Sequence, residues 1–229
     1  MNIAVILAGG TGSRMSLDKP KQFALINGRP LMAYTLSAFE NSLLIDKIYF
    51  VSNKDYIDES ALIIKEFNFV KVQQIIGGGK TRQESVYNAL KNIEAKDDDI
   101  VVLHDCARPL VTSQIIEENI RACIECQAVE TAIKVTDTIV ECDGKEMIQP
   151  LDREKLYQVQ TPQTFTFSLI KKAHQSALEN NIQNASDDAQ LIKLLGRSVR
   201  IVEGNKYNFK ITTDEDLLIF NAILNKNRT

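Results

Sequence analysis

Three glycines and two cations follow the first apolar run of the chain. Residues 7–15 read LAGGTGSRM, and Lys21 follows within KPKQF. Glycine lets backbone N–H groups approach a phosphate closely, and Arg14 and Lys21 add permanent positive charge. A dinucleotide G-x-G-x-x-G would need glycine where Met15 stands, and no Gly-Lys pair closes a P-loop. The pattern therefore predicts a triphosphate-binding loop of another kind. The alternative is a glycine turn with exposed basic side chains.

A second glycine-rich loop lies between a predicted strand and a predicted helix. Residues 77–85 read GGGKTRQES. Three consecutive glycines at a strand end suggest that a ligand approaches the backbone. The alternative is a flexible turn into a helix that Thr81 caps.

A third loop places an acid and a base after another predicted strand. Residues 104–109 read HDCARP. Asp105 and Arg108 at the carboxyl end of a strand suit a metal ion and an anionic substrate. The alternative is that these two side chains only pair with each other. His104 has no partner carboxylate or nucleophile in the pattern, so we interpret it as a buried strand residue.

Two further groups lie in the second half of the chain. Asp152-Arg153 precedes QTPQTF at residues 160–165, and Lys210 lies in the segment YNFKITTDEDL. A lone lysine in a short strand is usually only exposed. The sequence shows no Ser-His-Asp or Cys-His arrangement, so covalent catalysis has no support.

Composition excludes several classes of function. The 229 residues carry a net charge of −3, which argues against a general nucleic-acid surface. No apolar run is long enough to cross a bilayer, and the N-terminal residues lack the features of a signal peptide. We therefore expect a cytoplasmic protein with no nucleic-acid or membrane partner. Cys123 and Cys126 form one C-x-x-C without a second pair, so we expect two thiols on a helix in place of a zinc site.

The elements that must position these loops alternate between strand and helix. Near-continuous apolar strands separated by amphipathic helices predict an α/β doubly wound domain with a mostly parallel sheet. Ligands then bind beyond the carboxyl ends of the strands. The predicted strands are Ile3–Leu7, Lys47–Val51, Val70–Ile76, Ile100–His104, Glu130–Val135, Val199–Val202 and Asn208–Ile211. The predicted helices are Leu31–Phe39, Ile57–Phe67, Arg82–Ile93, Ile115–Ile124, Ser168–Leu178, Asp187–Leu195 and Asp214–Leu224.

Residues 136–160 interrupt this alternation. They carry no helical period, and Asp143-Gly144 between two β-prone runs indicates a hairpin. The segment is not rich in Gly, Ser or Pro, so it is interpreted as an excursion from the sheet and not as a linker. We expect Thr112 or Ser113 to cap the helix at 115–124, and Thr212 or Thr213 to cap the last helix.

Taken together, the five motifs resemble those of the cytidylyltransferases that join CTP to a polyol phosphate. The match runs in order from residue 3 to about residue 220. The resemblance implies one domain over residues 1–229, with a Rossmann-like nucleotidyltransferase fold and a protruding β-arm at residues 136–160. In the family this arm hooks around a second subunit, which implies a homodimer. It also implies Mg²⁺ as cofactor, CTP as co-substrate and a small polyol phosphate as acceptor.

The resemblance assigns roles to matching positions. Arg14 and Lys21 would stabilise charge on the α-phosphate, Arg153 and Lys210 would orient the acceptor, and these four are the expected catalytic residues. Asp105 would lie near Mg²⁺ and the ribose. The expected CTP-binding residues are Leu7, Ala8, Gly9, Gly10, Gly79, Lys80, Thr81, Arg82, Ser85, Asp105 and Cys106. The expected acceptor-binding residues are Asp105, Arg108, Thr138, Arg153, Thr161 and Lys210, with Thr138 and Arg153 coming from the partner's arm.

The motifs point to two different acceptor substrates. LAGG and YQVQTPQTF look more like the branch that uses D-ribitol 5-phosphate for teichoic acid or capsule synthesis. HDCARP and LDREKLY look more like the branch that uses 2-C-methyl-D-erythritol 4-phosphate for isoprenoid synthesis. The balance favours ribitol 5-phosphate or a similar polyol phosphate, with methylerythritol phosphate as the alternative. A sugar 1-phosphate nucleotidyltransferase and a non-catalytic nucleotide-binding protein on the same fold are the more distant alternatives.

Overall fold

A seven-stranded sheet forms the centre of the computed structural model, which describes residues 1–10, 19–183 and 185–226. The strand order is β11-β7-β10-β6-β1-β4-β5. The strands are β1 Asn2–Ala8, β4 Lys47–Ser52, β5 Val72–Gly77, β6 Ile100–Asp105, β7 Ala128–Lys134, β10 Tyr157–Thr166 and β11 Arg200–Glu203. Among them β10 alone runs antiparallel to its neighbours. The predicted α/β fold with a mostly parallel sheet is therefore confirmed.

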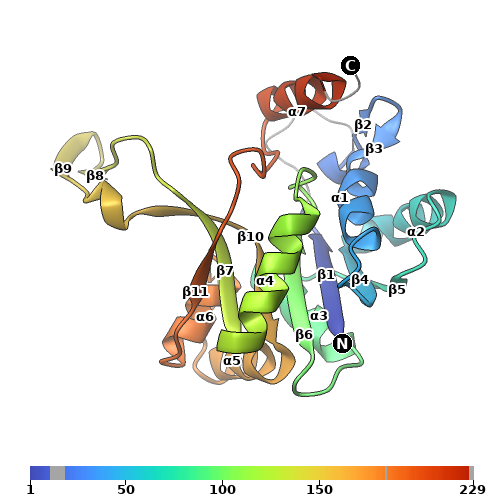
Figure 1. Cartoon of the computed structure of the whole chain (residues 1–229), viewed down its shortest axis with the longest axis horizontal. Coiled ribbons are helices and arrows are strands. Elements are labelled where there is room, and N and C mark those ends of the chain that lie inside the picture. The colour runs from blue at the N-terminus through green and yellow to red at the C-terminus, as the bar shows by residue number, and fades with distance from the viewer. Residues whose placement is uncertain (11–18, 184, 227–229) are drawn as a thin grey trace.

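Helices cover both faces of this sheet (Figure 1). They are α1 Leu31–Glu40, α2 Ile57–Glu66, α3 Arg82–Asn92, α4 Ser113–Cys126, α5 Phe167–Glu179 and α6 Asp188–Leu194, while α7 Asp214–Lys226 packs apart from these two faces. Side chains of α1, α2 and α4 pack on one face, and those of α3, α5 and α6 pack on the other. Successive strand residues point to opposite faces, so Ile6 joins the first cluster and Val5 the second.

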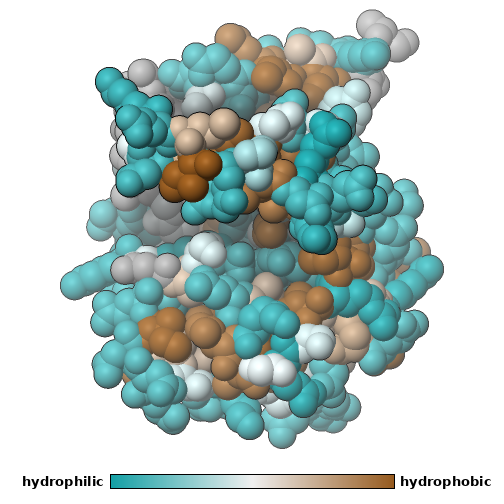
Figure 2. Space-filling model, turned by 90° about the vertical axis from the view of Figure 1, so that its left-hand side faces the viewer, coloured by the Kyte–Doolittle hydropathy of each residue, from teal (hydrophilic) through white to brown (hydrophobic). Residues whose placement is uncertain are grey.

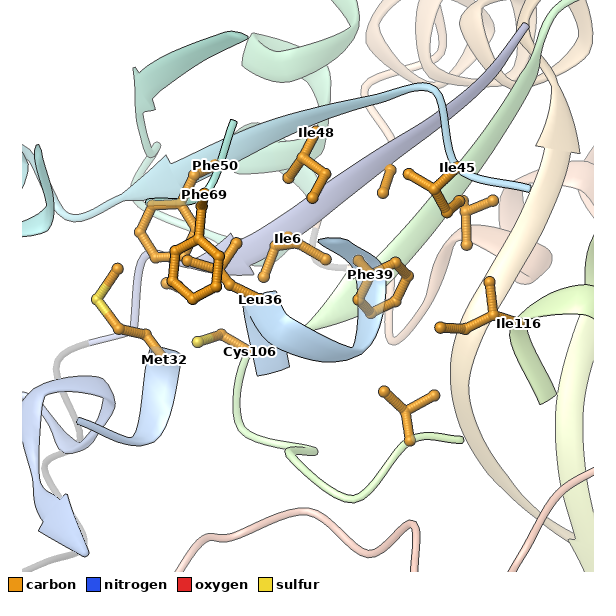
Figure 3. Close-up of a cluster of buried hydrophobic side chains, with 14 of the residues drawn as sticks. Ile6, Met32, Leu36, Phe39, Ile45, Ile48, Phe50, Phe69, Cys106 and Ile116 are labelled. Carbon is orange, nitrogen blue, oxygen red and sulfur yellow. The ribbon is translucent and has the colours of Figure 1, made fainter. Parts of the chain in front are cut away.

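The first of these clusters is the larger core. Figure 3 shows Leu36 and Phe39 of α1 lying against Ile6 of β1, with Ile48 and Phe50 of β4 beside them. All five side chains are fully buried. Burying such side chains fixes α1 against the middle of the sheet, and with it the start of α1 at the carboxyl ends of the strands.

Threonine side chains cap three of the helices near the strand ends. The Thr81 hydroxyl accepts a hydrogen bond from Glu84 N at the start of α3, and Thr112 accepts one from Ile115 N at the start of α4. Thr213 accepts one from Asp216 N in α7. These contacts satisfy N–H groups that the helix leaves unpaired. They confirm the predicted caps at the starts of α4 and α7, and the cap at Thr81 is the one named in the alternative interpretation of the second glycine-rich loop.

A small third cluster extends the carboxyl edge of the sheet. It joins α7 to the start of α1 and to a short hairpin, β2 Leu25–Ile26 and β3 Arg29–Pro30. Ile26, Leu31, Ile211 and Phe220 form its buried centre. Figure 1 shows α7 and this hairpin above the strand ends, so the cluster forms one wall of the space in which ligands are expected.

The predicted excursion is a projecting arm made of β8 Val140–Asp143 and β9 Glu146–Pro150 (Figure 1). Gly144 has φ +60° in the turn between them, a conformation that glycine adopts readily, and the predicted hairpin at Asp143-Gly144 is confirmed. The arm ends earlier than expected. Residues 157–160 belong to β10, where Tyr157 pairs with Lys134 of β7.

Two sequence predictions of strands were wrong in this region. β10 was not predicted, because its run YQVQTPQTF mixes polar side chains and a proline that resemble a loop. Those polar side chains find buried partners, as when the Gln163 amide donates to the Glu130 carboxylate. Residues 208–211 form no strand. The Asn208 side chain binds the Thr161 carbonyl and Ile211 N binds the Ala107 carbonyl, so the segment is held without a neighbouring strand.

Phe39→Ala should lower the free energy of unfolding by about 3–5 kcal/mol, because it leaves a cavity in the larger core. Phe39 is fully buried and its ring centre lies 5.0 Å from that of His104. Urea denaturation measures the change. Leu43→Ala is the control, since Leu43 is 93% exposed, and its effect should stay within about 0.5 kcal/mol. Equal losses in the two variants would contradict this account of the core.

Candidate active site

A pocket of about 320 Å³ lies beyond the carboxyl ends of β1, β5 and β6. This is where a parallel α/β sheet usually binds its ligand. The residues that line it are Leu7, Ala8, Gly9, Gly10, Lys21, Gln22, Leu31, Gly79, Lys80, Thr81, Arg82, Ser85, Asp105, Cys106, Ala107, Lys210 and Thr212. Every residue expected to bind CTP is in this set. The three loops found in the sequence therefore converge on one space.

The two glycine-rich loops are packed backbone to backbone. A Cβ on Gly78 would lie 3.3 Å from the Ser52 carbonyl oxygen and 3.3 Å from Ser85 Oγ, and one on Gly9 would lie 3.4 Å from Ser85 Oγ. Ser85 Oγ also accepts from Gly79 N at 3.0 Å and donates to the Thr81 carbonyl at 2.8 Å. These glycines therefore let the two loops pack closely, and Ser85 fixes that contact. The approach of a ligand to their backbone stays a prediction.

Lys21 reaches the pocket from a single turn of 3₁₀ helix at Lys21–Phe23. Its Nζ donates to the Ile211 carbonyl at 2.7 Å, which ties it to the segment that carries Lys210. The neighbouring Gln22 is buried and donates to the Ala8 carbonyl at 2.7 Å. Gln22 therefore joins this turn to the end of β1. Arg14, the other predicted cation of the first loop, lies outside the described residues.

The Asp105 carboxylate holds two cations of the pocket. Its Oδ2 accepts from Lys210 Nζ at 2.6 Å, and its Oδ1 accepts from Arg82 Nε at 3.3 Å. Burial alone would raise the pKa of Asp105, but the charges of Arg82 and Lys210 hold that pKa well below its usual range. The carboxylate is thus ionised at neutral pH.

Arg108 does not form the pair with Asp105 that the sequence left open. Its Nη1 donates to the Asn208 carbonyl at 2.8 Å and its Nη2 to the Val159 carbonyl at 3.4 Å. Arg108 follows Asp105 closely in the chain, but it is not among the residues that line the pocket.

His104 is buried in β6, as the sequence analysis interpreted it. Nε2 lies 3.1 Å from the Arg108 carbonyl, which only accepts, so Nε2 carries the proton and Nδ1 accepts from the Thr161 hydroxyl at 3.0 Å. That hydroxyl also accepts from Asp105 N at 3.1 Å. Thr161 therefore contacts the backbone of Asp105 from a buried position and does not line the pocket.

Thr138 and Arg153 lie on the arm and do not line the pocket of this chain. The Arg153 Nη1 donates to the Thr136 carbonyl at 2.9 Å, which keeps the side chain on the arm. The expected four catalytic residues are therefore not all brought together within one chain: Lys21 and Lys210 meet in the pocket, Arg153 does not, and Arg14 is outside the described residues.

Four pocket residues were not predicted as ligands: Gln22, Leu31, Ala107 and Thr212. Gln22 and Thr212 stand within the quoted motifs, next to Lys21 and close to Lys210, so adjacency was the available signal. Leu31 starts α1, and its pattern indicated only an apolar helix face. Nothing in the sequence brings it to the loops, because its place depends on the third core cluster.

The described residues contain no cluster of three or more His, Cys, Asp or Glu side chains suited to a metal ion. Cys123 and Cys126 are free thiols on α4, as expected. In the described part of the chain no helix is both long and apolar enough to span a membrane.

Comparison with known proteins shows which family has this sequence and this fold. Residues 2–226 match the family model described as IspD, 2-C-methyl-D-erythritol 4-phosphate cytidylyltransferase. Proteins of that name from Halalkalibacterium halodurans and Clostridium perfringens are 40% and 44% identical over 220 residues, covering 95–96% of each chain. The crystal structure of 4-diphosphocytidyl-2C-methyl-D-erythritol synthase from Anaerococcus prevotii superposes with a TM-score of 0.85 at 30% identity, over 98% of this chain and 96% of that one.

The fold and the glycine-rich, cationic pocket define a nucleotidyltransferase. More narrowly, the chain belongs to the 2-C-methyl-D-erythritol 4-phosphate cytidylyltransferase family and is a CTP-dependent cytidylyltransferase. The preference for ribitol 5-phosphate drawn from the first loop and from YQVQTPQTF is not supported, because the relatives above are named for methylerythritol phosphate. The motifs LAGG and YQVQTPQTF, on which that preference was based, therefore do not support ribitol phosphate as the acceptor.

His104 should make stability fall in mild acid. Burial lowers its pKa to about 4 in the folded chain, against about 6.5 in an unfolded chain. The unfolded state then binds more protons between these values, so this contribution is present above pH 6.5 and is lost as the pH falls toward 4.

The comparison variant is His104→Gln. Its other titrating groups are those of the wild type, so their contributions cancel in the difference between the two unfolding free energies. The difference in unfolding free energy between wild type and variant should shrink by up to about 3 kcal/mol between pH 7 and pH 4. Urea denaturation at several pH values measures it. A difference that stays constant over this range would show that His104 does not titrate as described.

Proposed function

We propose that the chain transfers CMP from CTP to 2-C-methyl-D-erythritol 4-phosphate and releases pyrophosphate. The observation that carries the proposal is the family match over residues 2–226, together with relatives of 40–44% identity that bear this activity in their names. The convergence of all the expected CTP-binding residues on one pocket supports it.

The reaction needs positioning and charge neutralisation more than a strong base. An oxygen of the acceptor phosphate is already anionic and attacks the α-phosphorus of CTP in line. A new P–O bond forms, the bond to the β-phosphate oxygen breaks, and pyrophosphate leaves. Lys21, Lys80, Arg82 and Lys210 line the pocket with Asp105 as the one acidic side chain among its described lining residues. The positive potential of these side chains holds the two anionic substrates together against their repulsion. It also stabilises the negative charge that develops in the transition state.

We assign roles within the pocket from its lining residues. Gly9, Gly10 and the lining residues of the segment 79–85 would hold CTP, because they border the pocket and the glycines carry no side chain that would keep a ligand from the backbone. Lys21 would neutralise the α-phosphate together with Arg14. Lys210 would face the acceptor phosphate, next to Asp105.

Mg²⁺ fits this site through Asp105. Magnesium in nucleotide enzymes commonly uses one or two carboxylates together with substrate phosphates. Each Asp105 oxygen accepts one hydrogen bond from a cation and keeps further acceptor capacity, so the residues present fit such an ion. When bound, the ion would neutralise triphosphate charge. The chain's own contribution is the ionised carboxylate, held in place by Arg82 and Lys210.

A homodimer joined by the arms would complete the acceptor site. Ile139, Val140, Met147 and Ile148 are 38–63% exposed on a two-stranded hairpin that the described part of this chain leaves uncovered. An isolated hairpin of this size is marginally stable in water. Figure 2 looks at the molecule from the side of the arm and shows apolar side chains on that surface. The arms would therefore pack on a second copy, and Arg153 and Thr138 would reach its pocket.

Pyrophosphate release tests the acceptor. With CTP and Mg²⁺ we expect turnover with 2-C-methyl-D-erythritol 4-phosphate and at least 100-fold lower kcat/KM with D-ribitol 5-phosphate, as a site built for one polar acceptor discriminates by its hydrogen bonds. UTP, GTP and ATP serve as controls. Equal use of ribitol phosphate would overturn the acceptor, and a preference for UTP or GTP would favour a sugar 1-phosphate nucleotidyltransferase.

Mixed dimers test the crossed arm. Lys21→Ala and Arg153→Ala should each lose about 10²–10³ in kcat, by analogy with loss of one transition-state donor. A refolded mixture should recover part of the activity, because some heterodimers carry one intact site. Lys172→Ala, on the exposed side of α5, is the control for a charge removed elsewhere and should keep full activity. Demonstrated heterodimers without recovery would exclude sharing of Arg153 across the interface.

A further inference from the structure

A buried ion-pair cluster lies behind the pocket on the side of Arg82 away from Asp105. Arg82 starts α3 and lines the pocket, yet its guanidinium also reaches inward. Nη1 donates to Asp188 Oδ2 at 2.5 Å and Nη2 donates to Gln163 Oε1 at 3.3 Å, while Nε faces Asp105. Arginine has five N–H donors, and three of those of Arg82 are used by these protein partners.

Asp188 and His174 form the floor of this cluster. Both side chains are 1% exposed, and His174 Nε2 lies 2.9 Å from Asp188 Oδ1. Asp188 N also donates to Gln163 Oε1 at 3.2 Å. The amide of Gln163 is oriented in turn, since its Nε2 donates to Glu130 Oε1. Residues from α3, α5, α6, β7 and β10 thus meet around one guanidinium.

The two carboxylates hold Arg82 from opposite sides. Asp105 is shared with Lys210, which binds it at 2.6 Å, shorter than the 3.3 Å contact from Arg82. Asp188 gives Arg82 its shorter contact, and within the described residues no lysine and no other arginine pairs with Asp188. Without the charge of Asp188, a guanidinium in this partly buried place would lose its stronger anchor and would turn toward Asp105.

We propose that Asp188, fixed by His174, is a positioning residue that aims the Arg82 guanidinium at bound CTP. This inference rests on the proposed function, which places CTP in the pocket that Arg82 lines. A merely structural ion pair would stabilise the fold without affecting the nucleotide. The two roles differ in what a neutral, isosteric substitution does to CTP binding.

Calorimetric titration with CTP and Mg²⁺ tests the role without requiring an acceptor. Asp188→Asn should raise the Kd for CTP about tenfold, the effect of weakening one charge-assisted hydrogen bond. Asp99→Asn is the matched control: Asp99 is also buried and bonded to Lys96 N, but it precedes β6 at the opposite edge of the sheet. The Kd of the Asp99→Asn protein for CTP should stay within about twofold of the wild-type value.

A second pair of variants tests the same role if the Asp188→Asn protein does not fold. His174→Leu removes the donor to Asp188 and should weaken CTP binding several-fold, whereas His174→Gln keeps an N–H donor and should restore it. Asp188→Asn should also add nothing in an Arg82→Met background, because Asp188 acts through Arg82. A wild-type Kd for CTP in Asp188→Asn or His174→Leu would overturn this inference and leave the proposed function untouched. No CTP binding by the wild type would overturn the proposed function itself.

Discussion

Cations of like charge gathered in one pocket repel each other, and the site depends on the carboxylate that opposes this repulsion. Asp105 binds Lys210 on one oxygen and Arg82 on the other, at the end of the fully buried strand β6. The surrounding positive charges keep it ionised despite burial. The cations are thereby held in place, so a triphosphate bound there as proposed would need little reorganisation of the site.

The position of Asp105 in turn depends on groups that never face the ligand. Its N–H donates to the Thr161 hydroxyl, which donates to His104, which donates to the Arg108 carbonyl. His104 packs against Phe39, so the polar chain ends in the larger core. A neutral histidine suits this place because both of its nitrogens are used and no charge is buried. The antiparallel strand β10, through Thr161 and Gln163, supplies two of the contacts on which the site rests.

Much of the fold followed from patterning. Apolar strands and amphipathic helices in alternation indicate a parallel sheet covered on both faces, since each element must bury its apolar side. That prediction, the hairpin at Asp143-Gly144 and the caps at Thr112 and Thr213 are confirmed. β10 was not predicted because its buried polar side chains depend on partners from β7, α3 and α4 that lie far away in the sequence, namely Glu130, Arg82 and Asn119. The segment at Asn208–Ile211 has strand-like residues, but it is held by the Thr161 and Ala107 carbonyls and pairs with no strand among the described residues.

The sequence by itself determined the phosphate chemistry: glycines where backbone must approach a ligand, and lysines and arginines without a nucleophile. These signals are local, because each loop carries its own residue types. Only the tertiary structure decided that Lys210 meets Asp105 from 105 residues away, and that Asp188 and His174 stand behind Arg82. It also placed Arg153 on an arm outside its own pocket. Such pairings depend on which strands become neighbours in the sheet, and that is a property of the whole chain's packing, not of any one motif.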